Sequence, residues 1–366
     1  MPSEFGIIKK FFTEKSTQKN KNTRLGIGDD AAIVSVPSGY DMVIAVDTLV
    51  AGVHFPKQTS SFDIGYKSLA VNLSDLAAMG AQPCSFTLAL TLSELEQNQS
   101  WLGNFSAGLF ERANKSNIEL IGGDTTCGPL TVSIQAHGLI PINKAMLRSG
   151  AKPGDLVFVT GSLGDAALGL QLVQKTLSPK ENISFELRNE LTDEEKIYCI
   201  ERLNRPQPKT AVGLQLRDIA SSCIDISDGL LADLGHICET SKCRAVVRES
   251  CLPLSSAFKK YYSIDSEATL LAATGGDDYE LCFTVNPNNL SRLNELDLNC
   301  LITQVGEIFS IDQYTESEIE SGSSEANVSL LNKAGGVIPV VKKGYTHFQN
   351  IEQPQGRPKL NKRIIK

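Results

Sequence analysis

Apolar and polar positions along the chain predict alternating helices and strands. Between residues 63 and 81, apolar side chains recur at helical spacing among alanines, and Gly80 is a natural stop. Residues 130–136 alternate between apolar and polar side chains, which is typical of a strand with one polar face. The same criteria predict further helices at 4–12, 97–117, 209–220, 230–239, 267–273 and after 286, further strands at 41–47, 84–92, 119–121, 155–160, 244–248, 279–285 and 303–308, and a hairpin turn at 334–336.

The length and the pattern together predict an α/β (α+β) fold in two domains. The chain has 366 residues, which is more than one ordinary hydrophobic core organises. A polar, glycine-containing stretch at 141–155 is a candidate linker, so we predict one domain over 1–141 and a second over 142–348. Residues 349–366 are predicted to be a basic, disordered tail.

Charge and cysteine usage exclude several classes of function. The formal net charge is −7, and five positive charges fall in the last ten residues, so the rest of the chain repels nucleic acid. No apolar run approaches the roughly 20 residues that span a bilayer. The nine cysteines are scattered and never spaced CxxC, which favours neither a disulfide framework nor a zinc site. We therefore expect a cytoplasmic protein that binds neither membranes nor nucleic acid.

Aspartates recur where a strand, helix or glycine turn is predicted to begin or end. Any one of them, Asp75 in the 63–81 helix included, is by itself most simply a turn or capping carboxylate. Taken together they predict a shared site, because ordinary surface carboxylates scatter along helix faces, and their segments contain almost no Lys or Arg to neutralise them. The set comprises Asp29, Asp30, Asp47, Asp75, Asp124, Asp225, Asp228 and Asp277.

If these carboxylates converge, they require bound metal. Oxygen ligands without Cys or His alongside favour Mg²⁺, which binds a few carboxylates together with phosphate oxygens, so a polyphosphate is the expected substrate. Calcium storage is the non-enzymatic alternative, but the twelve-residue EF-hand pattern is absent. Neither GxGxxG nor GxxxxGK[ST] occurs, so the sequence supports neither a Rossmann nor a P-loop nucleotide site.

Eight short motifs together resemble one known family. They are GIGDDAA, DTLVAGVHF, NLSDLAAMGA, IGGDTT, RSGAKPGD, DISDGL, GGDDYELCF and GYTHF. In this order and spacing they resemble the thiamine-monophosphate kinases, over about residues 4–348. The resemblance implies the fold shared with aminoimidazole ribonucleotide synthetase and selenophosphate synthetase, in which the N-terminal sheets of two subunits form a barrel in a homodimer. It also implies that ATP and thiamine phosphate react to give ADP and thiamine diphosphate.

The resemblance also implies roles for individual residues. The magnesium ligands are expected to be Asp30, Asp47, Asp75, Asp124 and Asp225, together with Ala45 and Val46 through their main chains, and Asp228 for a further ion. Contacts to ATP are expected from Gly123, Asp124, Arg148 and Ser227, and contacts to thiamine phosphate from His54, Asp277 and Tyr345. Potassium is an additional candidate cation. Of these residues, Asp30, Asp47, Asp75, Asp124, Asp225 and Arg148 are the expected catalytic set.

Two departures from the family pattern change the expectation. Ala45 and Val46 stand where members often carry Ser or Thr, so only carbonyls remain to hold metal, and we expect a higher magnesium requirement. Asp277 stands where Glu is usual, and its carboxylate is one methylene shorter.

Three alternatives stay open at this stage. A sister enzyme could use ATP on another acceptor, although no reactive Cys or Lys precedes Asp29 in a glycine-rich setting. A carrier of the hydrogenase-maturation type would need a C-terminal cysteine, which is not found at Arg363–Lys366. A non-catalytic nucleotide-binding homologue would require Ala45, Val46 and Asp277 to disable the site.

Overall fold

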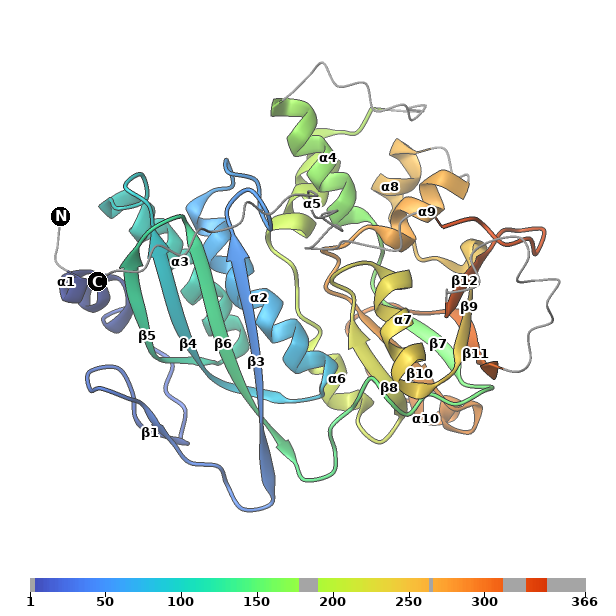
Figure 1. Ribbon diagram of the computed structural model, residues 1–366, viewed down its shortest axis with the longest axis horizontal. Helices are drawn as coiled ribbons and strands as arrows, with labels where there is room; N and C mark the ends of the chain where they lie inside the picture. The colour runs from blue at the N-terminus through green and yellow to red at the C-terminus, as the bar shows by residue number, and fades with distance from the viewer. Residues whose placement is uncertain (1–3, 178–189, 263–265, 312–326, 341–366) are drawn as a thin grey trace, which may run out of the picture.

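The first half of the chain contains a four-stranded sheet. The structure is a computed structural model and describes residues 4–177, 190–262, 266–311 and 327–340. Neighbouring strands follow the order β3-β6-β4-β5, with β4 and β5 parallel and the other pairs antiparallel (Figure 1). The strands are β3 (Tyr40–Val50), β4 (Gln82–Leu92), β5 (Glu119–Cys127) and β6 (Thr131–Pro141).

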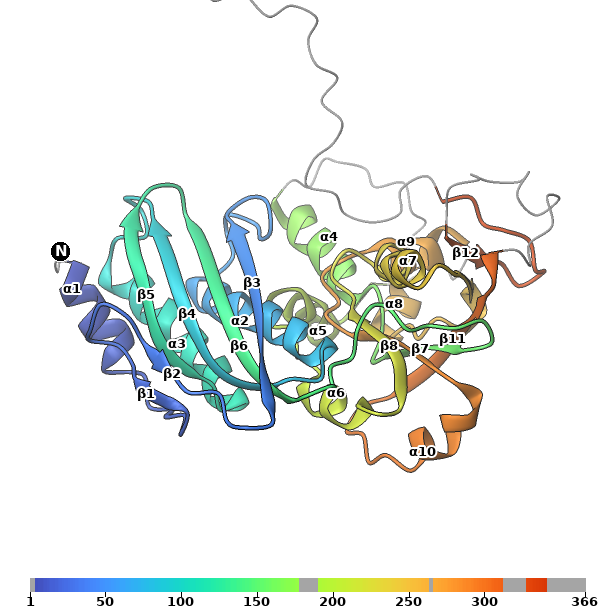
Figure 2. The same ribbon diagram turned by 60° about the horizontal axis from the view of Figure 1, so that its bottom comes forward.

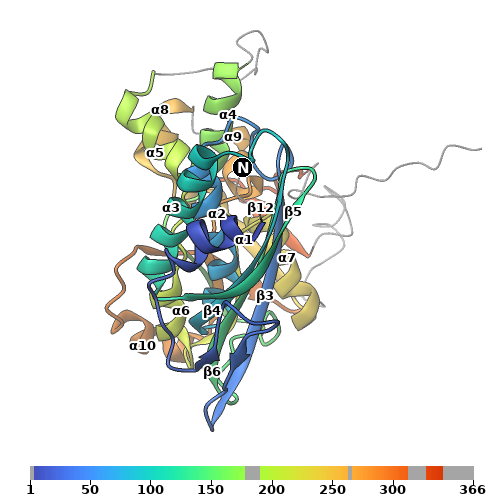
Figure 3. The same cartoon turned by 90° about the vertical axis from the view of Figure 1, so that its left-hand side faces the viewer.

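Two long helices cover one face of this sheet. They are α2 (Ser61–Ala78) and α3 (Gln99–Ser116). Gly65 and Gly108 let their backbones touch, because a Cβ on Gly65 would lie 2.1 Å from the main-chain oxygen of Phe105. Buried Leu69, Leu73 and Phe86 belong to the core between helices and sheet. None of the described helices covers the opposite face (Figures 1 and 3).

Short N-terminal elements lie beside the β5 edge of the sheet (Figure 2). Asn20 and Lys19 both contact the Glu119 carboxylate at the start of β5, which fixes the loop there. The elements are α1 (Glu4–Ile7), the π-helix η1 (Ile8–Thr13), β1 (Thr23–Leu25) and β2 (Ile33–Val34).

The second half of the chain contains a six-stranded sheet. Its order is β12-β9-β11-β7-β10-β8, and every pair is antiparallel except β12 with β9. The strands are β7 (Leu156–Thr160), β8 (Ala220–Asp225), β9 (Arg244–Arg248), β10 (Leu281–Val285), β11 (Ile302–Phe309) and β12 (Val328–Leu331).

Helices pack on both faces of this second sheet. One face meets α4 (Asp165–Leu177), α7 (Leu230–Ser241), α8 (Ser256–Tyr261) and α9 (Ser266–Thr274), with α5 (Asp193–Asn204) behind α4. The other face meets α6 (Thr210–Leu216), α10 (Leu290–Asn294) and the C-terminal end of α2, so the sheet lies between two helical layers (Figure 2). The single turns η2 (Glu249–Cys251) and η3 (Pro287–Asn289) complete the description.

Most predicted elements are present, and four predictions were wrong in detail. Asp47 lies inside β3 rather than at its end, and β5 runs on to Cys127, so Gly123 and Asp124 belong to a strand and not to a turn. The helix predicted over 209–220 ends at Leu216, and the strand predicted over 279–285 begins only at Leu281. In addition, α5 was not predicted. The turn at 334–336 is confirmed by the hydrogen bond from the Asn332 N–H to the Gly336 oxygen, 2.8 Å long.

Tyr345 and the tail at 349–366 lie outside the described residues. Within the described part of the chain, no helix combines the length and the apolar character that a bilayer crossing requires.

Candidate functional site

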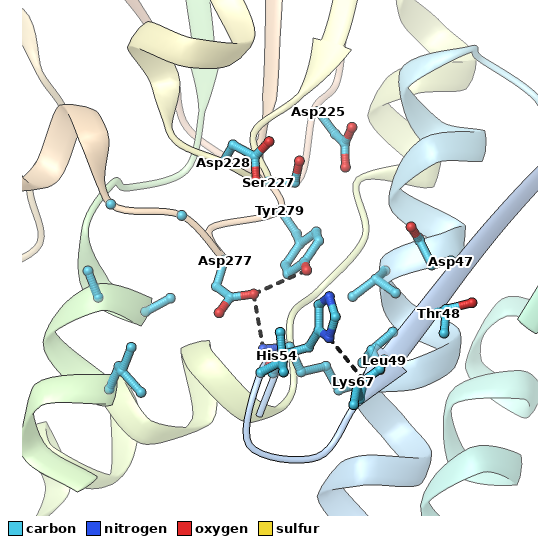
Figure 4. Close-up of a pocket in the computed structure, with 18 of the residues that line it drawn as sticks. Asp47, Thr48, Leu49, His54, Lys67, Asp225, Ser227, Asp228, Asp277 and Tyr279 are labelled. Carbon is cyan, nitrogen blue, oxygen red and sulfur yellow. Dashed lines mark hydrogen bonds and ion pairs between the residues drawn. The ribbon is translucent and has the colours of Figure 1, made fainter. Parts of the chain in front are cut away.

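A cavity of about 880 Å³ opens between the two halves of the chain (Figure 4). Its walls come from β3, α2 and the loop after β3 on one side, and from α4, α9 and two loops of the second sheet on the other. The apolar part of the lining comes from both walls, with valines and a leucine on the N-terminal side and alanines and leucines from α4 and α9 on the other. The polar part is dominated by aspartates from both halves.

The N-terminal wall is fixed by contacts between β3 and α2. Ser60 caps α2 by accepting the Asp63 N–H, and within the helix Asp75 is one of the few residues that are not fully buried. Asn72, which is fully buried, accepts the main-chain N–H of Asp47 at 3.1 Å. This bond places Asp47 beside Asp75.

The C-terminal wall consists of two loops that hydrogen-bond to one another. The Asp277 N–H donates to the Ser227 oxygen, and the Tyr279 N–H donates to the Ile226 oxygen, both at 2.8 Å. Gly276 permits this approach, because a Cβ there would lie 2.4 Å from the Ser227 oxygen. Asp277 and Tyr279 have φ values of 67° and 49°, so the loop adopts left-handed backbone that side chains rarely favour.

A buried carboxylate organises the first of these loops. Asp233, on α7, accepts the N–H groups of Ser227, Asp228 and Gly229 on a single oxygen at 3.0, 3.0 and 3.1 Å. Burial raises the pKa of Asp233 to about 8, and the negative charges of Asp225 and Asp228 add to this. The loop is therefore held at the start of α7 without help from a ligand.

Three carboxylates crowd the centre of the cavity. Burial, together with the nearby charges of Asp225 and Asp47, raises the pKa of Asp75 to about 8. Burial likewise raises the pKa of Asp225 to about 6 and raises the pKa of Asp47. The site thus holds more negative charge than its own cations offset.

Two cations lie near the carboxylates, although the acidic segments contain almost no Lys or Arg. Lys67 lies 3.0 Å from Asp277, and Arg148 is close enough to lower the pKa of both Asp75 and Asp225. Lys67 belongs to the helix that carries Asp75, and Arg148 begins the RSGAKPGD motif; of the two, only Arg148 was among the expected site residues. Neither cation pairs with Asp47, and the central carboxylates remain undercompensated.

The structure brings together only part of the expected set. Val46, Asp47, His54, Asp75, Asp225, Ser227, Asp228 and Asp277 line the cavity, whereas Asp30, Ala45, Gly123, Asp124 and Arg148 are not among its lining residues. Asp47 and Asp124 lie on opposite edge strands, three strand spacings or roughly 14 Å apart. The register places Gly123, not Asp124, on the Asp47 face of the sheet.

Three residues of the site were not predicted from the sequence. Lys67 stands out as the one cation in an otherwise small and apolar helix, and that signal was available. Tyr279 contributes a hydroxyl that donates to Asp277 at 3.1 Å. Asp233 follows Asp228 by five residues, and nothing in the motif itself shows that its carboxylate folds back onto the loop.

The carboxylate oxygens of the cavity are of the chemical type that binds a magnesium ion. Asp47, Asp75 and Asp225 supply hard oxygen ligands with raised pKa values, as expected of carboxylates that lack a counterion. Within the ranges the structure describes, no three His, Cys, Asp or Glu side chains are already arranged as a complete metal site. A bound ion would therefore draw its remaining ligands from water or from substrate oxygens, as Mg²⁺ commonly does.

Comparison with known proteins agrees with this architecture. A family model for the "AIR synthase related protein, N-terminal domain" matches residues 28–140. The thiamine-monophosphate kinase of Salmonella typhimurium (strain LT2) is 43% identical over 347 residues, which cover 94% of this chain and 98% of that protein. The solved thiamine-monophosphate kinase of Stenotrophomonas maltophilia K279a has 39% identity and a TM-score of 0.76, over 92% of this chain and 98% of that one.

A further solved structure carries ligands. It is AaThiL complexed with AMPPCP and TMP, with 25% identity and a TM-score of 0.69 over 94% of this chain and 97% of that chain. The two sheets and the acidic cleft between them thus define a protein of the AIR synthase-related class. Within that class, the chain belongs to the thiamine-monophosphate kinase family.

Proposed function

We propose that this chain transfers the γ-phosphoryl group of ATP to thiamine phosphate, giving thiamine diphosphate and ADP. Family membership supports the reaction, and AaThiL has been solved with AMPPCP and TMP. The observation that carries the proposal is the meeting of Asp47 and Asp75 with Asp225, Ser227 and Asp277 from the other half of the chain in one cavity. Two anionic reactants can meet in so acidic a cavity only when bound cations neutralise its charge.

Magnesium is the proposed cofactor. Asp47, Asp75 and Asp225 would hold it, with Asp228 at a further ion. When bound, the ion neutralises phosphate charge and helps to align the two reactants. Asp30, Ala45 and Asp124 remain proposed ligands that are supported by the motifs and not by their place in this cavity, whereas the proposed main-chain ligand Val46 lines the cavity. Potassium dependence remains a prediction.

The chain's own residues position the reactants. Arg148 is proposed to bind phosphate oxygens of ATP through two parallel hydrogen bonds, with Ser227 and Gly123 as further ATP contacts. His54, Asp277 and Tyr345 are proposed to contact thiamine phosphate. Because the Val50 N–H donates to His54 Nδ1 at 2.9 Å, the neutral ring carries its proton on Nε2.

The transfer is proposed to be direct and in line. The accepting phosphate is already largely ionised near neutral pH, so the reaction needs alignment and charge neutralisation more than a general base. We expect no phosphorylated enzyme intermediate. A short pulse with γ-labelled ATP, followed by denaturation and protein isolation, should leave no label on the protein, and stoichiometric labelling would contradict direct transfer.

The assay that tests the function uses ATP, Mg²⁺ and thiamine phosphate, with thiamine as the control acceptor. Thiamine should not be phosphorylated at a comparable rate, since it lacks the anionic acceptor group. Asp225→Asn should lower kcat by roughly 100-fold or more, because it removes a carboxylate from the centre of the cavity. Turnover that survives complete chelation of divalent ions, or that prefers another acceptor, would refute the proposal.

We also propose a homodimer formed through the uncovered face of the four-stranded sheet. Ile44, Val46 and Tyr40 are 56%, 64% and 43% exposed on it, which is unusual for one contiguous strand. The register places all three on the face opposite α2, since Asp47 and Leu49 point the other way.

The cytoplasmic location suggested by cysteine usage remains a prediction.

A further inference from the structure

Lys67 occupies an unusual position for a lysine. It lies in the second turn of α2, and its side chain is only 2% exposed. Neighbouring residues of the helix, Ile64, Tyr66 and Leu69 among them, are buried as well. Burying an ammonium group is costly unless a carboxylate and other acceptors replace the lost water. The buried Lys67 ammonium must therefore have such acceptors nearby.

The acceptors of Lys67 come from both sides of the cavity. Its Nζ lies 3.0 Å from Asp277 Oδ1, and it donates to the main-chain oxygen of His54 at 3.4 Å. Asp277 belongs to the loop before β10 in the second half of the chain, whereas His54 belongs to the loop after β3 in the first half. Lys67 therefore joins the two residues that are proposed to contact the acceptor (Figure 4).

The Asp277 carboxylate is held in one orientation by this arrangement. The Tyr279 hydroxyl donates to the same oxygen, Oδ1, at 3.1 Å. With both partners on Oδ1, the second oxygen points away from them (Figure 4). The carboxylate is 30% exposed, so it stays accessible while its rotation is restricted. Asp277 is one methylene shorter than the Glu that is usual at this position in the family. These two contacts fix the direction of its shorter side chain.

We infer that Lys67 is a positioning residue that orients Asp277 and the His54 loop for the phosphate acceptor. The inference rests on the proposed function, because it takes the acceptor to be a phosphate ester that carries an organic cation. Although Lys67 is among the residues that line the cavity, its side chain is 2% exposed and its Nζ is engaged by Asp277 and the His54 oxygen, so we expect it to act through these two groups. Its ammonium also offsets the Asp277 charge, which keeps a carboxylate ordered inside a cavity that already holds four other aspartates.

The test separates acceptor binding from other steps. Lys67→Met keeps the apolar stem and removes the charge. We expect KM for thiamine phosphate to rise about tenfold or more while KM for ATP stays within about twofold, because the ATP contacts lie on other residues. Isothermal titration with thiamine phosphate should show a matching loss of affinity. An unchanged KM for thiamine phosphate in a folded variant would overturn the inference.

A matched control separates positioning from docking of the two halves. Arg205 also bridges them, through its ion pair with Asp63, but neither residue lines the cavity. Arg205→Gln should therefore leave KM for thiamine phosphate within about twofold of the wild type. If Arg205→Gln raises that KM as much as Lys67→Met does, Lys67 acts only by joining the halves and the inference fails.

A double variant tests whether Lys67 acts through Asp277. In an Asp277→Asn background, adding Lys67→Met should raise KM for thiamine phosphate by much less than it does in the wild type. The double variant also removes both partners of the buried pair, so it guards against misfolding caused by one uncompensated charge. Equal effects of Lys67→Met in both backgrounds would exclude Asp277 as its target. Wild-type turnover with thiamine phosphate, measured alongside, reports on the proposed function separately.

Discussion

Asp75 is the residue at which stability and function conflict most clearly. It lies close to two further carboxylates, Asp225 and Asp47, and burial together with their charges raises its pKa to about 8. In the metal-free protein an ionised Asp75 is therefore unfavourable. A carboxylate with this cost is suited to a cation that arrives with the substrate and is poorly suited to packing.

Asp75→Asn should stabilise the metal-free protein at alkaline pH. The folded-state pKa lies above the ordinary value of 3.8, so the contribution of Asp75 to stability is complete below about pH 4 and is lost as the pH rises through about 8. Asparagine does not ionise, and we expect a gain of about 1–2 kcal/mol at pH 8.5 and much less at pH 5. Thermal denaturation in EDTA at both pH values measures it.

The same variant should lose the response to magnesium. Wild-type protein should gain Tm on addition of Mg²⁺, and the gain should be larger at pH 8.5 than at pH 6, because ionised carboxylates bind the ion. Asp193→Asn serves as the control, since Asp193 is 93% exposed on α5 and far from the cavity residues in sequence. A magnesium-induced shift in Asp75→Asn equal to that of the wild type would contradict this assignment.

At the scale of elements, the junction between β8 and α7 shows how a loop is fixed before ligands bind. Asp233 gathers three consecutive N–H groups, while the loop carrying Asp277 pairs with it from the other side. The N–H groups at this helix start are thereby satisfied from within the chain. The loop's side chains, Ser227 and Asp228, are then directed at the cavity.

Asp233→Ala should disorder this junction, whereas Asp233→Asn should preserve it. Alanine removes the acceptor of three buried bonds, at a cost of about 1–3 kcal/mol in stability and, by displacing Ser227, about a tenfold rise in KM for ATP. Asparagine keeps an acceptor oxygen and resembles the neutral carboxyl favoured by the raised pKa. Urea denaturation and steady-state kinetics on both variants provide the measurement. Equal losses in the two variants would show that charge, not hydrogen bonding, holds the loop.

The sequence predicts an element well where the element's own residues carry the signal, and poorly where contacts with distant segments determine it. The 63–81 helix and the strand at 244–248 carry their own periodicity, and both are present. The helix α5 carried a local signal that was missed, a capping box in which Thr192 and Glu195 bond reciprocally. The path of β5 through Gly122–Asp124 had no such signal, because pairing with β4 carries the strand past two glycines.

The residues of the site likewise fall into those that local motifs identified and those that only the tertiary fold brings in. Motifs gave the identities of Asp47, Asp75, Asp225 and Asp277, all of which line the cavity. They did not give Lys67, whose partner lies 210 residues further along the chain and is reached only through the tertiary fold. Contacts between distant segments depend on how the two sheets sit against each other, and no local pattern records that.

At the scale of the whole molecule, the two halves meet along α2. Its C-terminal end packs against the second sheet and α6, and Arg217 donates from that side to the Gly80 oxygen at 2.6 Å. The face of the first sheet that α2 leaves uncovered has no such partner among the described elements. An exposed apolar strand face of this kind costs solubility unless a second surface covers it.

Ile44→Glu should therefore weaken self-association. The wild-type chain should sediment as a dimer, and a buried carboxylate opposite its own symmetry mate should raise the dissociation constant by at least tenfold. Ile197→Glu is the matched control, because Ile197 on α5 is 55% exposed against 56% for Ile44 but lies on the other half of the chain. Analytical ultracentrifugation over a range of concentrations distinguishes them. A monomeric wild type, or equal weakening by both substitutions, would place the contact elsewhere or nowhere.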